Sequence, residues 1–397
     1  MTTTTGRATY REVLAEPRFR LLFLTRSVAI AADTLRIVAL SVLVFAATGS
    51  PLLGAVTYGI GFLPQILGTT LLGALADRIP PRRLIVAGYA LECASAVALA
   101  LAHLPVAASL LLVAAIAALT PVFGGASSRV VAEVLTGDAY VLGRSLSSMA
   151  SSGAQLLGLA GAGVAIALVG ARHALLASAA CHLGAAVAVR LRLPDLALPP
   201  RAAGSTVRQS WLGNHRLLAD RRVRALLLAQ WLPPAFVTGA ESLIVPYAAE
   251  RGFPAGASGL LLACLPVGML AGDLVVGRFV RPAARERLVA PLVAVLGAPL
   301  IALAANPPPL IVAALLTLTG TGFAYGLGLQ RRFLDALPPA RRGQAFGLLS
   351  AGLMTLQGVG PAGFGVLAEL TRVGAAIAVA GAATLIGAVL MRTLRSG

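Results

Sequence analysis

Among the charged residues inside the long apolar stretches of the sequence, three could take part in chemistry: Asp33, Arg36 and Glu241. If these stretches span a bilayer, a charge at the centre costs about 2.5–3.5 kcal/mol, so it usually marks a pathway or a paired site. Asp33 and Arg36 are three residues apart, which places them on one helical face, where they can neutralise each other. Glu241 has no charged neighbour within a turn and must be protonated, face water or pair with another helix.

The chemistry open to these residues is the binding of a proton or a cationic ligand by carboxylates whose partners change. Two structural alternatives remain open. Asp33 and Arg36 could form a permanent ion pair, and Glu241 could lie at the outer end of a helix and reach water.

Six polar or aromatic residues are weaker candidates for lining a ligand cavity: Trp231, Thr317, Thr321, Tyr325, Gln155 and Gln357. Residues of these types also pack helices against one another, which is the alternative. Glu92 and Asp273 are interpreted as partners of cytoplasmic arginines, and His182 as a hydrogen-bonded packing residue.

Composition shows what surrounds these residues. The chain has 397 residues, of which 58% are hydrophobic and 12% charged, and a mean hydropathy of +0.86. It has far more apolar surface than one soluble core could bury, so it is a membrane protein. The sequence contains no Lys, which excludes a Walker A phosphate loop and a Schiff-base lysine. Cys93, Cys181 and Cys264 are isolated, so we expect neither a disulfide framework nor a metal site, and no cofactor.

Twelve segments are long and apolar enough to span a bilayer. They begin near Leu21, Leu52, Leu84, Val106, Tyr140, Ala174, Val223, Gly256, Leu288, Leu310, Gln344 and Val373. Most of the 32 basic residues lie in alternate loops; the exceptions are Arg172, Arg251 and Arg372 in the other loops, and Arg26 and Arg36 in the first span. The positive-inside rule then predicts that both termini are cytoplasmic, and that the net charge of +17 sets topology rather than binding nucleic acid.

The longest polar interval, residues 194–220, divides six spans from six. We therefore predict an N-terminal six-helix bundle (1–193), a cytoplasmic central loop and a C-terminal six-helix bundle (221–397). Internal similarity at an offset of 202 pairs Gln155 with Gln357, Gly158 with Gly360, and Gly161 with Gly363. An even number of helices per half gives parallel repeats, and a ligand would bind between the halves.

Residues 73–83, GALADRIPPRR, end an apolar stretch in a group of charges on the predicted cytoplasmic side. This segment resembles the loop signature of the major facilitator superfamily, roughly G-x-x-x-D-R-x-G-R-R/K. The matching residues are Gly73, Asp77, Arg78, Arg82 and Arg83, while Pro80 and Pro81 replace a glycine and a basic residue of the pattern.

Two further segments resemble one bacterial branch of the superfamily, the enterobactin- and macrolide-type exporters. Residues 19–51 have Asp33 mid-span and TGSP at the first outer turn, and residues 357–369 carry that branch's Gly-Pro turn. The fifth span departs from the branch, because it has Gly158-Leu159 where Gly-Pro is usual.

The resemblance implies a conformational latch. Asp77 would accept hydrogen bonds from the amino end of the eleventh span, near Gly343 and Gln344, and so hold the two halves together on the cytoplasmic side. The alternative is that the neighbouring arginines only set topology. The resemblance also implies that the first, fourth, seventh and tenth spans surround a central cavity, with Asp33 and Glu241 on facing helices.

The expectation is thus an all-α integral membrane protein, with twelve transmembrane helices in two parallel-repeat six-helix bundles. It would be a monomer in the bacterial inner membrane, exporting a small amphipathic molecule by alternating access in exchange for protons. Its partners would be that small-molecule substrate, protons and the lipid bilayer. Lipid or nutrient translocation by the same fold, or a non-transporting receptor or scaffold, are the alternatives. An enzyme is disfavoured because the sequence has neither HExxH nor GxSxG.

Overall fold

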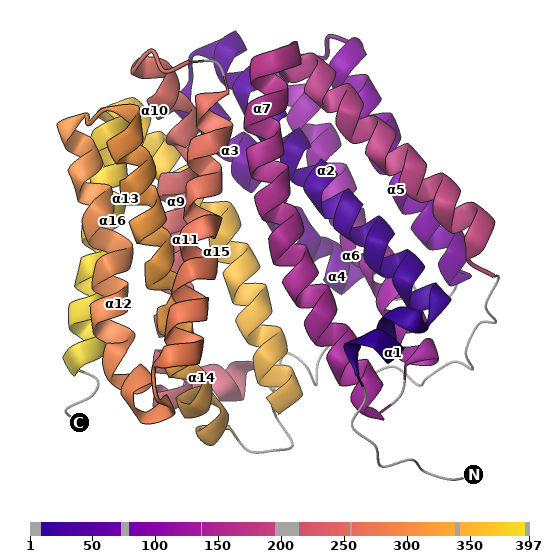
Figure 1. Ribbon diagram of the computed structural model, residues 1–397. Helices are drawn as coiled ribbons and strands as arrows, with labels where there is room; N and C mark the ends of the chain where they lie inside the picture. The colour runs from indigo at the N-terminus through magenta and orange to yellow at the C-terminus, as the bar shows by residue number, and fades with distance from the viewer. Residues whose placement is uncertain are drawn as a thin grey trace. The chain divides into compact units, whose positions relative to one another are not determined.

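The computed structural model describes residues 9–72, 79–135, 137–194, 214–254, 256–337 and 342–393, and within these ranges every regular element is a helix (Figure 1). In chain order, the helices are α1 (Tyr10–Ala15), α2 (Pro17–Thr48), α3 (Pro51–Gly59), α4 (Leu63–Leu72), α5 (Pro81–Leu101), α6 (Val106–Val134), α7 (Gly137–Arg192), α9 (Arg221–Ser242), α10 (Ile244–Glu250), α11 (Ala257–Phe279), α12 (Pro282–Ala302), α13 (Pro309–Thr321), α14 (Tyr325–Asp335), α15 (Arg342–Leu370) and α16 (Val373–Thr393). Short 3₁₀ turns, Leu303–Ala305 and Gly322–Ala324, lie on either side of α13.

These helices account for the predicted spans. By length and composition, 8 helical stretches of the described chain could each cross a membrane. One of them belongs to α7, whose 56 residues are interrupted at Gly170, with φ 81° and ψ 163°, so that α7 supplies the fifth and the sixth spans. α3 with α4, α9 and α16 are not among these 8 stretches, and they correspond in chain order to the second, seventh and twelfth predicted spans. The twelve-span prediction thus matches the described helices in order.

Several helices begin a few residues before the apolar stretch that predicted them. The reason is a proline in the first turn of α3, α5, α12 and α13. Proline is well suited to this place because the first N–H groups of a helix have no partner within the helix. At α3 the Ser50 side chain also accepts a hydrogen bond from the Leu53 N–H, at 3.1 Å, and caps the helix.

Packing contacts divide the chain into two compact units. The first comprises Met1–Leu40 and Pro64–Arg201, and the second comprises Ser41–Leu63 and Ala202–Gly397. The end of α2 and all of α3 therefore pack with the second unit, although they belong to the first half of the sequence. The predicted domain boundaries at the central loop stay a prediction, because most of that loop lies outside the described ranges.

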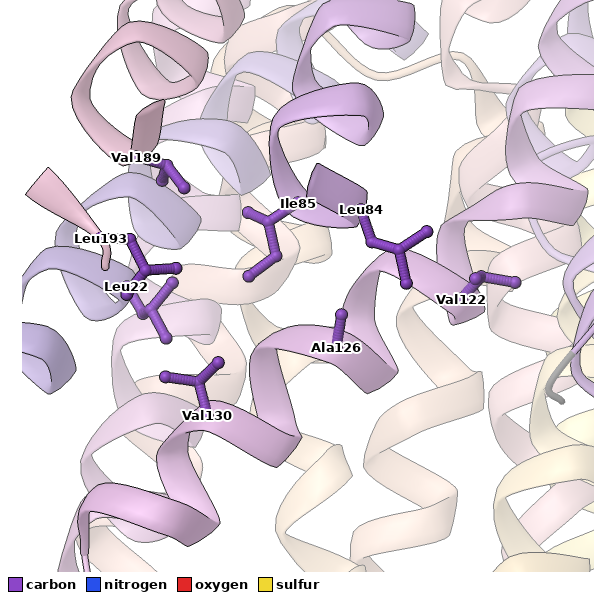
Figure 2. Packing of buried hydrophobic residues seen from close by; sticks show 8 residues of the cluster. All are labelled: Leu22, Leu84, Ile85, Val122, Ala126, Val130, Val189 and Leu193. Carbon is purple, nitrogen blue, oxygen red and sulfur yellow. The ribbon is translucent and has the colours of Figure 1, made fainter. Parts of the chain in front are cut away.

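The first unit has a buried apolar core that joins α2, α5, α6 and the end of α7 (Figure 2). Its members are Leu22, Leu84, Ile85, Val122, Ala126, Val130, Val189 and Leu193. The three contributed by α6 are four residues apart, so they form one stripe along that helix.

The second unit has its own core, in which α9, α14 and α15 meet. Leu227, Phe333 and Ala345 are almost fully buried there. Phe333 also packs edge-to-face with Phe346, with ring centroids 5.5 Å apart. Each unit thus buries apolar side chains independently of the other.

Glycines at equivalent positions of the internal repeat allow the same close helix packing in the two units. A Cβ atom on Gly158 of α7 would lie 2.6 Å from the Ala31 carbonyl oxygen of α2. A Cβ atom on Gly360 of α15 would lie 2.6 Å from the Ala235 carbonyl oxygen of α9. Only glycine allows this approach of two helix backbones. The structure therefore supports the pairing of the fifth with the eleventh span that the sequence offset indicated.

We predict that substitution by alanine has opposite effects on stability at two pairs of glycines. One pair is Gly158 and Gly360, and the other is Gly161 and Gly363. A methyl group added at Gly161 or Gly363 would meet open space, and alanine is the better helix former by about 1 kcal/mol, so Gly161→Ala and Gly363→Ala should maintain or raise thermal stability. Gly158→Ala and Gly360→Ala should lower the free energy of unfolding by about 1–3 kcal/mol through overpacking. Thermal unfolding of the purified variants checks this; equal effects at all four positions would contradict it.

The predicted topology can be tested with cysteines at exposed positions. In a variant without the three native cysteines, Ala305→Cys, just before the tenth span, should react with an impermeant thiol reagent from outside the cell. Ala219→Cys, just before α9, should react only after the membrane is opened. The reverse pattern of labelling would overturn the assignment of the cytoplasmic side.

Candidate functional site

Arg36 lies at the centre of a buried group of charged side chains in the first unit. Its Nη2 is 3.0 Å from Asp33 Oδ1 on the same helix, as the three-residue spacing predicted. Its Nη1 is 2.7 Å from Glu92 Oε2 on α5 and donates a hydrogen bond to Ser95 Oγ at 2.9 Å. One guanidinium therefore holds two carboxylates from different helices, using the forked geometry that arginine has and lysine lacks.

His182 of α7 completes this group. Its Nε2 is 3.3 Å from Asp33 Oδ1, at ion-pair distance, and neither ring nitrogen meets the geometry of a hydrogen bond with a described residue. Its ring packs against Tyr89 of α5, with ring centroids 6.4 Å apart. We call Asp33, Arg36, Glu92 and His182 the charge cluster.

Most of the charge cluster is shielded from solvent. The side chain of His182 is 0% exposed, that of Arg36 7% and that of Glu92 9%, whereas that of Asp33 is 34% exposed. Asp33 is thus the member that an ion from solution can reach first.

Polar residues next to the charge cluster hold its helices together. Ser178, one turn before His182 on α7, donates a hydrogen bond to the Ala32 carbonyl oxygen of α2 at 2.8 Å. Ser95, which receives the bond from Arg36, donates to the Glu92 carbonyl oxygen at 2.8 Å. On α5 and on α7, a serine and a titratable residue three or four positions apart therefore lie on one face, turned toward α2.

The structure corrects the interpretation of Glu92. It was predicted to pair with a cytoplasmic arginine, but its partner is Arg36 within the first span. His182 is buried, as a packing residue would be, but its polar contact is Asp33. The signal that could have revealed both was the serine one turn away on the same helical face. Asp273 is exposed on α11, and its predicted pairing stays a prediction.

The donor atoms of Asp33, Glu92 and His182 lie within 4.8 Å of one another, a spacing that a metal ion could use. However, the Arg36 guanidinium already contacts both carboxylates. A metal ion would be repelled by that charge and would have to displace it. The arrangement therefore suits an internal cation and an exchangeable proton better than a metal.

Glu241 of α9 has a different kind of partner. Its carboxylate is hydrogen-bonded to the Tyr58 hydroxyl of α3, and both side chains are half-buried in the second unit. Ser50, which lies shortly before Tyr58 in the sequence, is hydrogen-bonded to Glu369 at the end of α15. The expected placement of Glu241 opposite Asp33 stays a prediction.

Two of the weaker cavity candidates, Trp231 and Tyr325, make contacts between helices. Trp231 donates its indole N–H to the Leu349 carbonyl oxygen at 2.9 Å, and Tyr325 is 3% exposed, with its hydroxyl 3.5 Å from the Gln230 carbonyl oxygen. Both contacts bind helices of the second unit to one another.

The threonine and glutamine candidates are less constrained. Thr317 and Thr321 each donate to a carbonyl oxygen of their own helix. Gln155 is exposed and Gln357 half-buried. The cavity role of all six weaker candidates stays a prediction.

The latch prediction falls largely outside the described residues, since Gly73, Asp77 and Arg78 are not among them. Of the two that are described, Arg82 donates a hydrogen bond to the Arg190 carbonyl oxygen at 2.6 Å, and Arg83 is exposed. Arg82 thereby connects the start of α5 with the end of α7.

Comparison with known proteins gives a family and a fold. A family model described as Major Facilitator Superfamily matches residues 22–333. Curated protein sequences give no significant match. A crystal structure of the nucleoside transporter NupG is similar with a TM-score of 0.75 and 14% identity, covering 96% of this chain and 99% of that one. A POT family transporter in complex with a thioalcohol-conjugated peptide gives 0.71 and 12%, covering 95% and 96%. A bacterial homologue of the human lysosomal transporter Spinster gives 0.65 and 14%, covering 94% and 95%. At these identities the likeness shows the fold alone.

We predict that removing the guanidinium destabilises the protein. Arg36→Met leaves two buried carboxylates without their shared cation and should lower the free energy of unfolding by about 3–5 kcal/mol. The double variant Arg36→Met, Glu92→Gln should recover part of this loss, because only one carboxylate then needs compensation. Arg278→Met, which removes an exposed arginine of α11, is the matched control. Wild-type thermal stability of Arg36→Met would show that the charge cluster does not hold the helices together.

Proposed function

We propose that the chain, which belongs to the major facilitator superfamily and is therefore a multi-pass membrane transporter, has a specific transport activity. In this proposal it exports a small amphipathic molecule in exchange for protons. Export would proceed by alternating access, in which the units move relative to each other around the substrate. The chain would act as a monomer in the bacterial inner membrane with both termini cytoplasmic. The direction of transport rests on the resemblance of residues 19–51 to bacterial exporters.

The observation that carries the proton coupling is the position of Asp33. It lies in the middle of α2, is partly exposed, and contacts two buried side chains, Arg36 and His182, of which Arg36 also binds Glu92. A carboxylate that is open on one side and ion-paired on the other can change partners as its surroundings change. A purely structural ion pair would not need the open side.

The sequence also favours an ion gradient as the source of energy. Because the chain contains no lysine, it cannot form the lysine-containing phosphate loop of common ATPases. The titratable groups of the charge cluster, two carboxylates and an imidazole, are groups that can exchange protons. Protons are thus the ion that best fits the charge cluster.

The Tyr58–Glu241 contact suits a conformational role. α3 packs with the second unit, but it follows α2, most of which belongs to the first unit. If the units move relative to each other, there are two outcomes for α3. Either its contacts with α9 and α15 break, or α3 moves together with the second unit. A hydroxyl–carboxylate bond depends on the protonation of Glu241, so it can link this step to protons. The latch predicted at Asp77 would act in the same cycle.

We predict that the two carboxylates matter more for accumulation than for exchange. A panel of fluorescent amphipathic compounds, ethidium among them, would first identify a compound that the wild type transports in proteoliposomes. Asp33→Asn and Glu241→Gln should then abolish its accumulation driven by a pH gradient, while downhill exchange continues. Binding can survive without proton exchange, whereas uphill transport cannot.

The matched control is Glu250→Gln, which removes an exposed carboxylate at the end of α10 and should leave both modes unchanged. If both Asp33→Asn and Glu241→Gln keep wild-type pH-driven accumulation, neither carboxylate couples protons to transport. A protein that transports no compound of the panel in either mode would favour the receptor or scaffold alternative.

A further inference from the structure

We infer that the charge cluster is a single-proton binding site, in which the proton is held by the His182–Asp33 pair and Glu92 creates the need for it. This inference deepens the proposed proton coupling and rests on it for its role in transport. The binding of the proton itself can be measured without any substrate.

The formal charges of the cluster determine how many protons it binds. Asp33 and Glu92 contribute two negative charges when ionised, and Arg36 contributes one positive charge that it shares between them. With His182 neutral, the cluster has one excess negative charge. An uncompensated charge buried at this depth is strongly unfavourable. One added proton removes the excess, and a second would restore an imbalance of the opposite sign.

The contacts of the two carboxylates determine where that proton lies. Arg36 directs one nitrogen to each carboxylate, so the faces that Asp33 and Glu92 turn to Arg36 are occupied. The remaining short contact of Asp33 within the described chain is His182 Nε2, 3.3 Å away. A proton placed between these atoms makes a charge-assisted hydrogen bond whether it belongs formally to the imidazole or to the carboxylate.

The exposure of the cluster members determines how the proton enters. His182 is fully buried and Asp33 is 34% exposed, so a proton from solution reaches the imidazole through Asp33. Arg26, two turns earlier on α2, is exposed and acts electrostatically on Asp33. Its positive charge favours release of the proton to the open side. His182 and Asp33 therefore form a two-residue relay with one open end.

Apart from Arg26, no described group around the cluster adds a charge to it. From α5, Tyr89 packs its ring on His182 while its hydroxyl is hydrogen-bonded to Thr25 of α2. The part of α6 from Val106 to Ser128 contains no titratable residue. Arg26, Tyr89 and the four cluster members are therefore the groups that determine proton binding here.

The test uses the full-length protein, purified in detergent and labelled with ¹⁵N-histidine. The sequence has four histidines, so the NMR signal of His182 can be assigned by its loss in His182→Gln. We expect that signal to change in one step between about pH 5 and 8, the range in which an imidazole side chain can change charge. Glu92→Gln should lower the proton affinity at least about tenfold, moving the midpoint down by about one pH unit or more. Glu133→Gln, the same change at a partly exposed carboxylate of α6, should leave the midpoint in place.

Two results would overturn the inference: a His182 signal that does not change with pH across this range, or a midpoint that Glu92→Gln does not move. Glu92→Gln and His182→Gln keep side chains of similar size to those they replace. Thermal unfolding shows whether these two variants fold. The transport assay separates the two proposals. If the NMR result is as expected but His182→Gln retains wild-type pH-driven accumulation, the proton site stands and its coupling to transport fails.

Discussion

The rest of the first unit depends on one guanidinium that is shared between two carboxylates. Arg36 binds Asp33 on its own helix and Glu92 on α5, and His182 brings α7 to the same place through Asp33. Removing these groups from water is costly, so each must find its partner with good geometry. The small residues beside them allow this, because Gly158 and Ser178 bring α7 close to the backbone of α2. The packing of three helices is thus tied to the ionisation of four side chains.

The two units share a scaffold but differ in charge. Gly158 and Gly360 perform the same close packing at an offset of 202. At that offset, the positions equivalent to the charge cluster are occupied by uncharged residues, namely Ala235, Thr238, Ala294 and Thr384. The second unit instead has Glu241. Its carboxylate is hydrogen-bonded to Tyr58 of α3, a helix that comes from the first half of the sequence. The repeat therefore maintains the helix contacts, while the residues able to exchange protons differ from one unit to the other.

The sequence was sufficient to predict features that depend only on residues close together along the chain. Apolar length located the spans, the positive φ at Gly170 fits the predicted break between the fifth and sixth, and the three-residue spacing gave the Asp33–Arg36 pair. It failed for Glu92 and His182, because an isolated charge in an apolar run shows that a partner is needed but not which helix supplies it. It also could not place α3 with the second unit, since that depends on the fit of Gly59 and Gly365 to opposing side chains.

The central claim is that the charge cluster binds one proton and exchanges it with solution through Asp33. The most direct measurement is the transient current that follows a pH jump applied to substrate-free proteoliposomes on a solid-supported membrane. The account predicts a charge displacement that saturates when one proton has bound per protein and that disappears in the double variant Asp33→Asn, His182→Gln. The same displacement in wild type and in that variant would contradict it.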